Sequence, residues 1–362
     1  MPDWSRIHEE KIFHASYLPL SLLSFFYGFG ARLRTNIMKN RKKMSLPGFT
    51  VSIGNLTAGG TGKTPATCMM AEWAMGEGYK VAILSRGYGG QNKKKVSIVS
   101  DGEKIFAGPK EIGDEPYLLA KRLKGAAVVI SKNRYNAGLE AQKRFGASFF
   151  ILDDGYQHLR LKRDLNLLLL DASSPFGNGR LLPRGPLREP LGELTRADVI
   201  ILTRAGAGKG IEIRDGLEKI FQGKSLFMGN HIPEKIIFTS RDGGHDPSLL
   251  IGKRVVAFAG IARPLSFRDT LINLGAEITY YKAFPDHHYF NHDEIRDLMD
   301  EKEKTGADFI ITTEKDWARL VNVIPGDPAL AYLTIRFDLL SERTRFFDIV
   351  RETIGEKGNN RQ

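Results

Sequence analysis

Short apolar runs rich in β-branched residues alternate with longer stretches of helical periodicity along most of the chain. The first runs are at residues 49–53, 81–84, 127–130, 148–152, 167–170 and 199–202. Runs that are apolar throughout predict strands covered on both faces, and their alternation with helices is typical of a parallel sheet. A short hairpin is expected to interrupt this order at about residues 94–107, as an excursion from the sheet, because Asp101-Gly102 is a strong turn pair.

The alternation stops near Gly223 and then resumes, with further strands expected at residues 255–259, 309–312 and 332–335. The pattern therefore predicts an α/β fold with a parallel-sheet domain at residues 46–222 and a smaller α/β lobe at residues 223–362. The boundary is loose, because Gly206–Gly210 and Arg241–Pro247 both have the composition of linkers.

The first 45 residues have a different pattern, an apolar and aromatic stretch followed by basic residues. Tyr17–Phe29 is apolar but too short to cross a bilayer. The basic residues after it are Arg32, Arg34, Lys39, Arg41, Lys42 and Lys43. A secretory signal peptide would place its positive charges before the apolar part. Residues 1–45 are therefore expected to lie on a membrane, with the basic run against anionic headgroups, or else to form an ordinary core helix.

Composition narrows the possible partners. The 362 residues, 42% of them hydrophobic, are enough to bury a large core. Cys68 is the single cysteine, which excludes an intrachain disulfide and favours a reducing, cytosolic setting. A net charge of +11 favours an anionic partner, which can be a nucleotide, a nucleic acid or an acidic membrane surface.

A glycine-rich segment joins the first expected strand to a helix. It consists of Gly59, Gly60, Thr61, Gly62, Lys63 and Thr64. In such a loop the glycines let backbone N–H groups converge on phosphate oxygens, the lysine reaches the β- and γ-phosphates, and the threonine hydroxyl can bind Mg²⁺. The segment therefore predicts a binding site for a nucleoside triphosphate.

The context of this phosphate loop supports the prediction more than the bare motif does. The usual motif has Gly or Ala five residues before Gly62, where this chain has Thr57. A second Gly-Lys-Ser triplet, at residues 223–225, precedes an expected strand and has no neighbouring glycines, so we interpret it as a turn.

Two pairs of carboxylates are candidates for binding Mg²⁺ and for activating an acceptor. Asp153 and Asp154 end an apolar strand, as in the metal-side strand of phosphate-loop proteins, although both could be turn caps. Asp114 and Glu115 precede a helical stretch, where Asp114 could equally be an N-cap.

A histidine would make one of these carboxylates a better base. A carboxylate near Mg²⁺ and phosphate is usually too acidic to accept a proton, unless a histidine shares that proton. His287 and His288, next to Asp286 in the second lobe, are the candidates. They could also be metal ligands or simply solvated loop residues.

These segments together resemble the tetraacyldisaccharide 4′-kinase family, the lipid A 4′-kinases of Gram-negative bacteria. The matching segments run in the family's order over almost the whole chain, at residues 54–65, 85–89, 113–116, 153–158, 182–189, 258–264, 284–288 and 312–316. Thr57 is usual at its position in this family, and Tyr156 stands where phenylalanine is common.

The resemblance implies a reaction. The γ-phosphate of ATP would be transferred to the 4′-hydroxyl of a tetraacyldisaccharide 1-phosphate, giving the 1,4′-bisphosphate of lipid A biosynthesis. It also implies a phosphate-loop NTPase-like sheet domain, ATP and Mg²⁺ as cofactors, and a location on the cytoplasmic face of the inner membrane. A substrate with four acyl chains stays in the bilayer, so the N-terminal segment would bring the enzyme to it.

The same resemblance implies roles for individual residues. Lys63 would bind the β- and γ-phosphates, and Asp114 would be the general base, its proton affinity raised by His287 or, alternatively, by His288. Because His287 lies on the second lobe, this pairing would require the lobes to close. The expected Mg²⁺ ligands are Thr64, Glu115, Asp153 and Asp154. The expected substrate or phosphate contacts are Arg134, His158, Arg184, Arg188 and Glu189.

Two other classes of protein share some of these features. A switch or assembly ATPase at the membrane surface would have the same phosphate loop. A GTPase is disfavoured, because residues 313–316 lack the spacing of the guanine-specific Asn-Lys-x-Asp motif. Nucleic-acid binding rests only on the net charge and on Lys93–Lys95, a run that is more simply a solvated loop.

Overall fold

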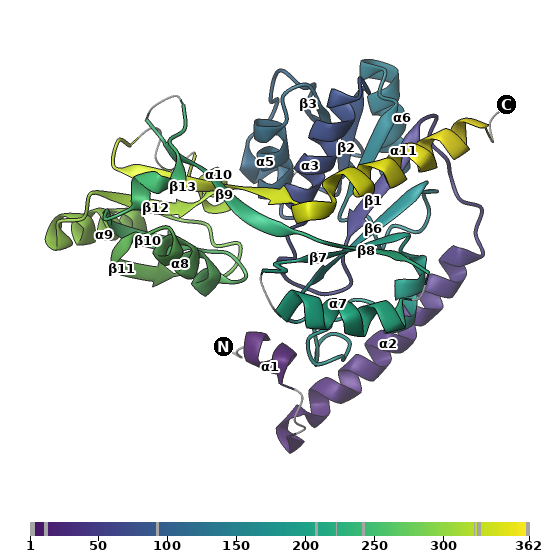
Figure 1. Ribbon diagram of the computed structural model, residues 1–362, viewed down its shortest axis with the longest axis horizontal. Coiled ribbons are helices and arrows are strands. Elements are labelled where there is room, and N and C mark those ends of the chain that lie inside the picture. The colour runs from purple at the N-terminus through teal and green to yellow at the C-terminus, as the bar shows by residue number, and fades with distance from the viewer. Residues whose placement is uncertain are drawn as a thin grey trace.

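The computed structural model describes residues 4–10, 14–91, 94–206, 209–221, 223–240, 243–321, 323 and 327–359. Lys93 and parts of the two expected linkers, residues 207–208 and 241–242, lie outside the described residues. Two sheets, each with its own helices, form the two lobes of the molecule (Figure 1).

The larger sheet has eight strands in the spatial order β3-β4-β2-β5-β1-β6-β7-β8. All neighbours are parallel except β3 and β4. The strands are β1 (Phe49–Gly54), β2 (Val81–Ser85), β3 (Ser97–Ser100), β4 (Ala127–Ile130), β5 (Phe149–Asp153), β6 (Leu165–Asp171), β7 (Val199–Thr203) and β8 (Ser225–Met228). The parallel-sheet domain predicted from the apolar runs is thus confirmed.

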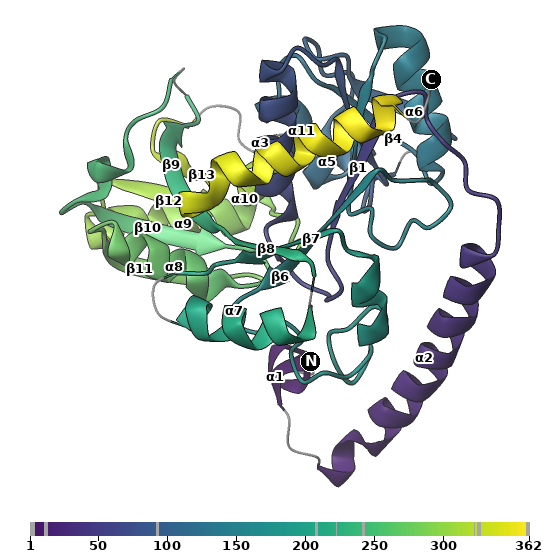
Figure 2. The same ribbon diagram turned by 45° about the vertical axis from the view of Figure 1, so that its right-hand side comes forward.

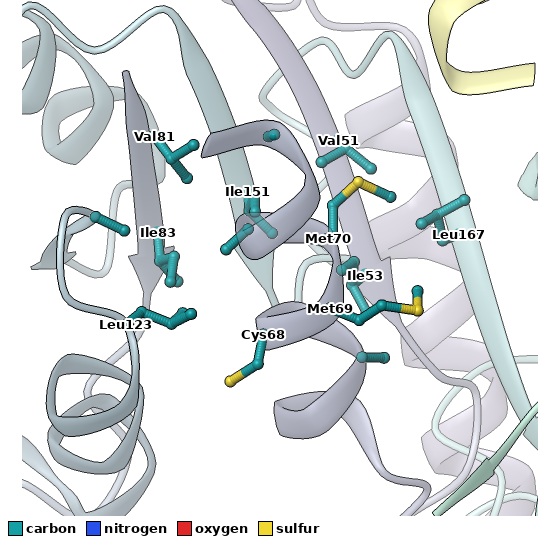
Figure 3. Packing of buried hydrophobic residues seen from close by; sticks show 14 of the residues in the cluster. Val51, Ile53, Cys68, Met69, Met70, Val81, Ile83, Leu123, Ile151 and Leu167 are labelled. Carbon is teal, nitrogen blue, oxygen red and sulfur yellow. The ribbon is translucent and has the colours of Figure 1, made fainter. Parts of the chain in front are cut away.

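Helices cover both faces of this sheet, which is why its strands are apolar throughout. One face packs against α3 (Lys63–Gly76), α5 (Asp114–Arg122) and α11 (Arg343–Asn359). The other packs against α6 (Arg134–Phe145) and α7 (Lys209–Ile220). Figure 3 shows how α3 lies over the sheet, with its buried side chains among those of the strands. Burying each large side chain there stabilises the fold by roughly 1.5–3 kcal/mol.

The smaller sheet has five strands in the order β11-β10-β12-β13-β9, with β9 antiparallel to β13. The strands are β9 (Asn230–Phe238), β10 (Arg254–Ala259), β11 (Glu277–Ala283), β12 (Phe309–Thr313) and β13 (Leu330–Asp338). Its helices are α8 (Pro264–Asn273), α9 (His292–Thr305) and α10 (Glu314–Leu320). The remaining short elements are α1 (Trp4–Glu9), α4 (Pro109–Ile112), η1 (Ala15–Tyr17), η2 (Leu191–Arg196), η3 (Pro247–Leu250) and η4 (Leu340–Glu342).

The second lobe begins later and ends earlier than the expected range of residues 223–362. Strand β8 belongs to the larger sheet, and the chain crosses to the second lobe along β9 and returns along β13. Helix α11 then packs on the first domain, where Phe346 and Phe347 are buried and Phe347 stacks on Trp73 at 4.8 Å between ring centroids. This apolar contact holds the C-terminal helix α11 against the first domain rather than the second lobe (Figure 2).

The expected hairpin near residues 94–107 is a part of the larger sheet rather than an excursion from it. Strand β3 pairs with β4 at the edge of that sheet. The second arm is reduced to one bridge between Ser100 and Ile105. Asp101 forms the turn by accepting hydrogen bonds from the N–H groups of Glu103 and Lys104, at 2.9 and 2.8 Å.

Helix α2 (Leu18–Lys39) lies along one side of the first domain (Figure 2). Its small residues Ser24 and Gly28 face the segment near Leu181, whose carbonyl accepts a hydrogen bond from Ser24 Oγ at 2.8 Å. The opposite face is apolar and exposed, with Leu18, Leu22, Leu23, Phe25, Phe26, Phe29, Leu33 and Ile37 uncovered. Within the described part of the chain, no helix is both long enough and apolar enough to cross a bilayer.

Candidate functional site

The phosphate loop follows β1 and ends where α3 begins at Lys63. Gly59 and Gly62 have φ values of 111° and 80°, a region that favours glycine. Gly62 is the N-cap of α3, and no side chain caps this helix. The first N–H groups of α3 are therefore available to an anion, and the half-buried Thr64 follows Lys63 in the first turn.

Lys63 and Arg188 converge on one carboxylate beside this loop. Lys63 Nζ lies 3.1 Å from Asn55 Oδ1 and 3.4 Å from Asp154 Oδ1. Arg188 Nη1 donates to Asp154 Oδ2 at 2.9 Å. Burial opposes ionisation of Asp154, but the charges of Lys63 and Arg188 outweigh it and lower the pKa of the carboxyl to about 2. Positive charge is thus concentrated where phosphates would lie.

Asp153 is buried, and its carboxyl contacts the hydroxyls of Ser85 and Thr67 at 3.3 and 3.4 Å. Burial, and then the charges of Glu115 and Asp154, raise its pKa to about 7. A cation near these carboxylates would relieve that repulsion, so the residues fit a Mg²⁺ site. The described residues contain no group of three or more His, Cys, Asp or Glu side chains placed to hold a metal by themselves. Mg²⁺ sites commonly complete their coordination with phosphate oxygens and water.

The raised pKa of Asp153 predicts a pH-dependent gain in stability for Asp153→Asn. The folded protein holds the Asp153 proton more tightly than the unfolded chain does. The contribution of this protonated carboxyl to the free energy of unfolding is therefore full below pH 4 and is lost as pH rises through about 7. At pH 8 without metal or nucleotide, the variant should be more stable than the wild type by on the order of 2–4 kcal/mol. Thermal melts from pH 4 to pH 8 measure this difference.

Asp269→Asn provides the control, because the Asp269 side chain is 60% exposed and lies outside the site. Its melting temperature at pH 8 should stay close to that of the wild type. An Asp153→Asn protein that is less stable than the wild type at pH 8 would contradict the repulsion described above.

Asp114, at the start of α5, meets two residues of the second lobe. His287 Nδ1 lies 3.2 Å from Asp114 Oδ2, and Arg319 donates to the same oxygen from Nη2 at 2.5 Å and from Nε at 3.0 Å. The two lobes thus bring Asp114 and His287 into contact in this structure. His288 instead faces Glu294, with Nε2 2.9 Å from Oε1.

The environment of Asp114 keeps its carboxyl ionised. Burial acts to raise its pKa, but the hydrogen bond with His287 and the charges of Lys315 and Arg319 hold the pKa well below the usual range. The sequence-based expectation that His287 raises the proton affinity of Asp114 does not match this direction. Glu115, the next residue, pairs with Lys315 Nζ at 3.1 Å.

Arg134 also lies near the carboxylates, and His158 lies near Arg134. Arg134 is buried, and its interactions with Asp153 and Asp154 oppose the effect of burial, which lowers its pKa to about 10. Burial, and then the charges of Arg134 and Arg163, lower the pKa of His158 to about 4, so its imidazole is neutral near pH 7. Among the described residues, none hydrogen-bonds His158 Nε2.

Arg184 and Glu189, two of the expected substrate contacts, are buried and interact with other parts of the protein. Arg184 is fully buried and donates to the backbone carbonyls of Ile7 at 2.6 Å and Glu10 at 3.0 Å, which ties the N-terminal segment to the domain. Glu189 is buried and paired with Arg196. Neither side chain has the exposed surface that a substrate contact requires, so these two expectations are corrected here.

The sequence alone did not single out Asn55, Lys315 or Arg319 as site residues. Asn55 and Lys315 do lie within segments that carry the family resemblance. Arg319 lies just outside these segments. The one signal that could have indicated it is its place three residues after Asp316, on the same helix α10. Its partner Asp114 is 205 positions away along the chain.

The chain is similar in sequence to proteins of one family. A sequence model described as tetraacyldisaccharide-1-P 4′-kinase, LpxK, matches residues 16–354. Tetraacyldisaccharide 4′-kinase of Syntrophus aciditrophicus is 43% identical over 316 residues, 84% of each chain. The enzyme of that name from Geobacter metallireducens is 42% identical over 311 residues, 84% of this chain and 89% of its own.

A solved structure supports the same assignment. The crystal structure of LpxK from Aquifex aeolicus in complex with ATP is 32% identical in sequence to this chain. It superposes with a TM-score of 0.75, covering 94% of this chain and 99% of its own. The family resemblance, the fold class and ATP as the cofactor are thereby confirmed, and the chain belongs to the tetraacyldisaccharide-1-P 4′-kinase family.

Proposed function

We propose that this chain phosphorylates the 4′-hydroxyl of a tetraacyldisaccharide 1-phosphate at the cytoplasmic face of the inner membrane, using the residues described above. The observation that carries the assignment of roles is the pairing of Asp114 with His287 across the lobes, at 3.2 Å. Glu115, next to Asp114, and Lys63, in the phosphate loop, both affect the pKa of Asp153 through their charges. The Asp114–His287 pair and the phosphate loop therefore belong to one site.

The phosphate loop would hold the triphosphate. Backbone N–H groups from Gly59 to Thr64 would donate to the phosphates, and Lys63 would exchange Asp154 for a β- or γ-phosphate oxygen. Thr64, Asp153, Asp154 and Glu115 are the residues that would hold Mg²⁺, with Glu115 giving up its ion pair with Lys315. When bound, Mg²⁺ neutralises negative charge on the phosphates. Arg188, Arg134 and His158 would contact phosphate or substrate.

The Asp114–His287 pair would accept the hydroxyl proton. Asp114 stays a carboxylate and orients the imidazole through Nδ1, so that Nε2 is the nitrogen left to take the proton. The 4′-oxygen then forms its bond to the γ-phosphorus. The bond from the γ-phosphorus to the bridging oxygen breaks, and ADP leaves with that electron pair.

Helix α2 would bring the enzyme to its lipid substrate. Its exposed apolar face is contiguous, and a folded domain does not leave such a face uncovered without a reason. The helix also reaches the site, because Tyr27 Oη donates to the carbonyl oxygen of Arg188 at 2.9 Å. Basic residues at its C-terminal end suit anionic headgroups.

This role predicts that Leu22→Ser, Phe25→Ser and Phe29→Ser together weaken membrane binding. These side chains are 58%, 70% and 65% exposed, so their loss should not disturb the core. Losing three insertable side chains should reduce binding to vesicles containing phosphatidylglycerol by about tenfold or more. Co-sedimentation measures the change. Serine at the equally exposed Ile220, Ile251 and Ile272 is the control, and equal effects of the two triple variants would contradict the role of α2.

A labelling assay tests the proposed function as a whole. Purified protein is incubated with γ-labelled ATP and Mg²⁺, with and without the lipid disaccharide monophosphate. Label should appear in the lipid and depend on its presence. A switch or assembly ATPase would instead release free phosphate whether or not the lipid is there.

A further inference from the structure

Arg319 is a buried guanidinium at the junction of the two lobes. Its side chain is 2% exposed, and it lies on α10, which packs against α5 of the first domain. A buried cation is stable only when its N–H groups have acceptors. Arg319 finds them on Asp114, on the carbonyl of Gly260 at 2.8 Å and on Asp316 Oδ1 at 3.0 Å.

These contacts reach both members of the proposed proton-accepting pair. Nη2 and Nε of Arg319 both donate to Asp114 Oδ2. The Gly260 carbonyl that accepts from Nη1 also accepts from the backbone N–H of His287, at 3.2 Å. The guanidinium therefore contacts the carboxylate directly. It reaches the histidine in two ways, from Nη2, which lies 3.3 Å from His287 Nδ1, and through the backbone of Gly260.

The backbone of Gly260 is held on its other side as well. Asp316 Oδ2 accepts from the N–H of Gly260 at 3.0 Å and from the hydroxyl of Thr313 at 2.6 Å. Arg319, Asp316 and Gly260 thus form one closed hydrogen-bonded group. His287, whose φ is 60°, is joined to this group by its backbone N–H as well as by its ring.

We propose that Arg319 is a positioning residue for phosphoryl transfer, which aligns the Asp114 carboxylate and the His287 imidazole with each other. This inference rests on the proposed function of the pair. No other side chain touches Asp114 Oδ2 in the described structure apart from His287 and Arg319. Lys315, Asp286 and Tyr88 also face the pair, but none of them hydrogen-bonds both Asp114 and the Gly260 backbone.

Arginine suits this position for a geometric reason. Its planar fork can serve Asp114 with one edge while Nη1 serves Gly260 and Asp316. A lysine ammonium keeps the charge but cannot span these three acceptors. Arg319→Lys keeps the positive charge and removes the forked shape, whereas Arg319→Gln removes the charge. Comparing the two distinguishes the effect of the shape from that of the charge.

The experiment compares Arg319→Gln and Arg319→Lys in the full chain, using label transfer to the lipid. Arg319→Gln should lower kcat roughly 30–100-fold and change the KM for ATP by less than about threefold, because the loss falls on the chemical step. Arg319→Lys should recover part of that loss. Selective ¹⁵N-histidine NMR of the nucleotide-free protein provides a second readout, and the His287 Nδ1 signal should shift in Arg319→Gln.

Arg122→Gln is the matched control. Arg122 is a partly buried arginine between the lobes, with its side chain 13% exposed. Its N–H groups donate to the Ile335 carbonyl at 2.7 Å and to Glu234 at 2.7 Å, and it does not touch Asp114 or His287. It should lower the melting temperature without the same fall in kcat or a change at His287. The inference is overturned if Arg319→Gln loses no more kcat than Arg122→Gln, or if the His287 signal is unchanged.

Two outcomes need to be kept apart. Absence of label transfer by the wild type would reject the proposed function itself, whereas transfer by the wild type with an unaffected Arg319→Gln would reject only this inference. If Arg319→Gln does not fold, Arg319→Lys decides: a kcat equal to that of the wild type would show that the forked geometry is unnecessary.

Discussion

Replacing Asp114 with asparagine is expected to lower kcat by about 10²–10³-fold and to change the KM for ATP by less than about threefold. Asparagine has nearly the same shape, but it lacks the charge that orients and stabilises His287 during proton transfer. Steady-state kinetics of label transfer measure both constants. Equal losses in kcat and in ATP binding would count against a role for Asp114 in the chemical step.

A double variant makes this test sharper. If Asp114 and His287 act as one unit, Asp114→Asn combined with His287→Gln should be little slower than the worse single variant. Losses that multiply would show that the two residues act independently. Glu111→Gln, at an exposed carboxylate near the start of α5, is the control and should leave kcat unchanged. A melting curve for each variant separates catalytic loss from unfolding, because Arg319 loses a charged partner in Asp114→Asn.

Lys63→Ala is expected to lower kcat/KM by about 10³-fold or more, because it removes the cation that would contact the β- and γ-phosphates. Both ATP binding and kcat should fall, unlike in Asp114→Asn, because the contact forms in the ground state and strengthens in the transition state. Isothermal titration with ATP and steady-state kinetics measure the two effects.

The chain contains its own control for this prediction. Lys224, in the second Gly-Lys-Ser triplet, lies in a turn before β8 and donates to the carbonyl of Thr195 at 2.9 Å. Lys224→Ala should therefore cost some stability but leave kcat/KM unchanged. A similar loss of activity in both lysine variants would contradict the assignment of the phosphate loop.

Most strands of the first domain could be predicted because they are apolar on both faces. Strands β9 and β11 were missed, whereas β8 was expected after the Gly-Lys-Ser triplet at residues 223–225. β9 and β11 are long but mostly half-buried, with polar residues among the apolar ones, so no continuous apolar run marks them. Strand β8 is apolar but short, and its position after the Gly223 turn placed it beyond the expected domain boundary.

Some residues of the candidate site could be predicted from the sequence, and others could not. The phosphate loop is a contiguous segment, so sequence was enough to predict it. Arg184 and Glu189 lie in a segment of the family pattern, yet the fold buries them against Ile7 and Arg196. A sequence motif reports which residue types are present, but it does not distinguish a buried structural arginine from one that faces a ligand.

By itself, the sequence determined what depends on neighbouring residues: the alternation of strands and helices, the glycines and lysine of the phosphate loop, and the apolar face of α2. The contacts between charged groups that are far apart in the sequence depend on how the chain folds. Asp114 and His287 are 173 positions apart, and their contact depends on how β9 and β13 join the lobes. The same packing assigns Arg319 to Asp114, because a buried guanidinium must find its acceptors wherever the fold places them.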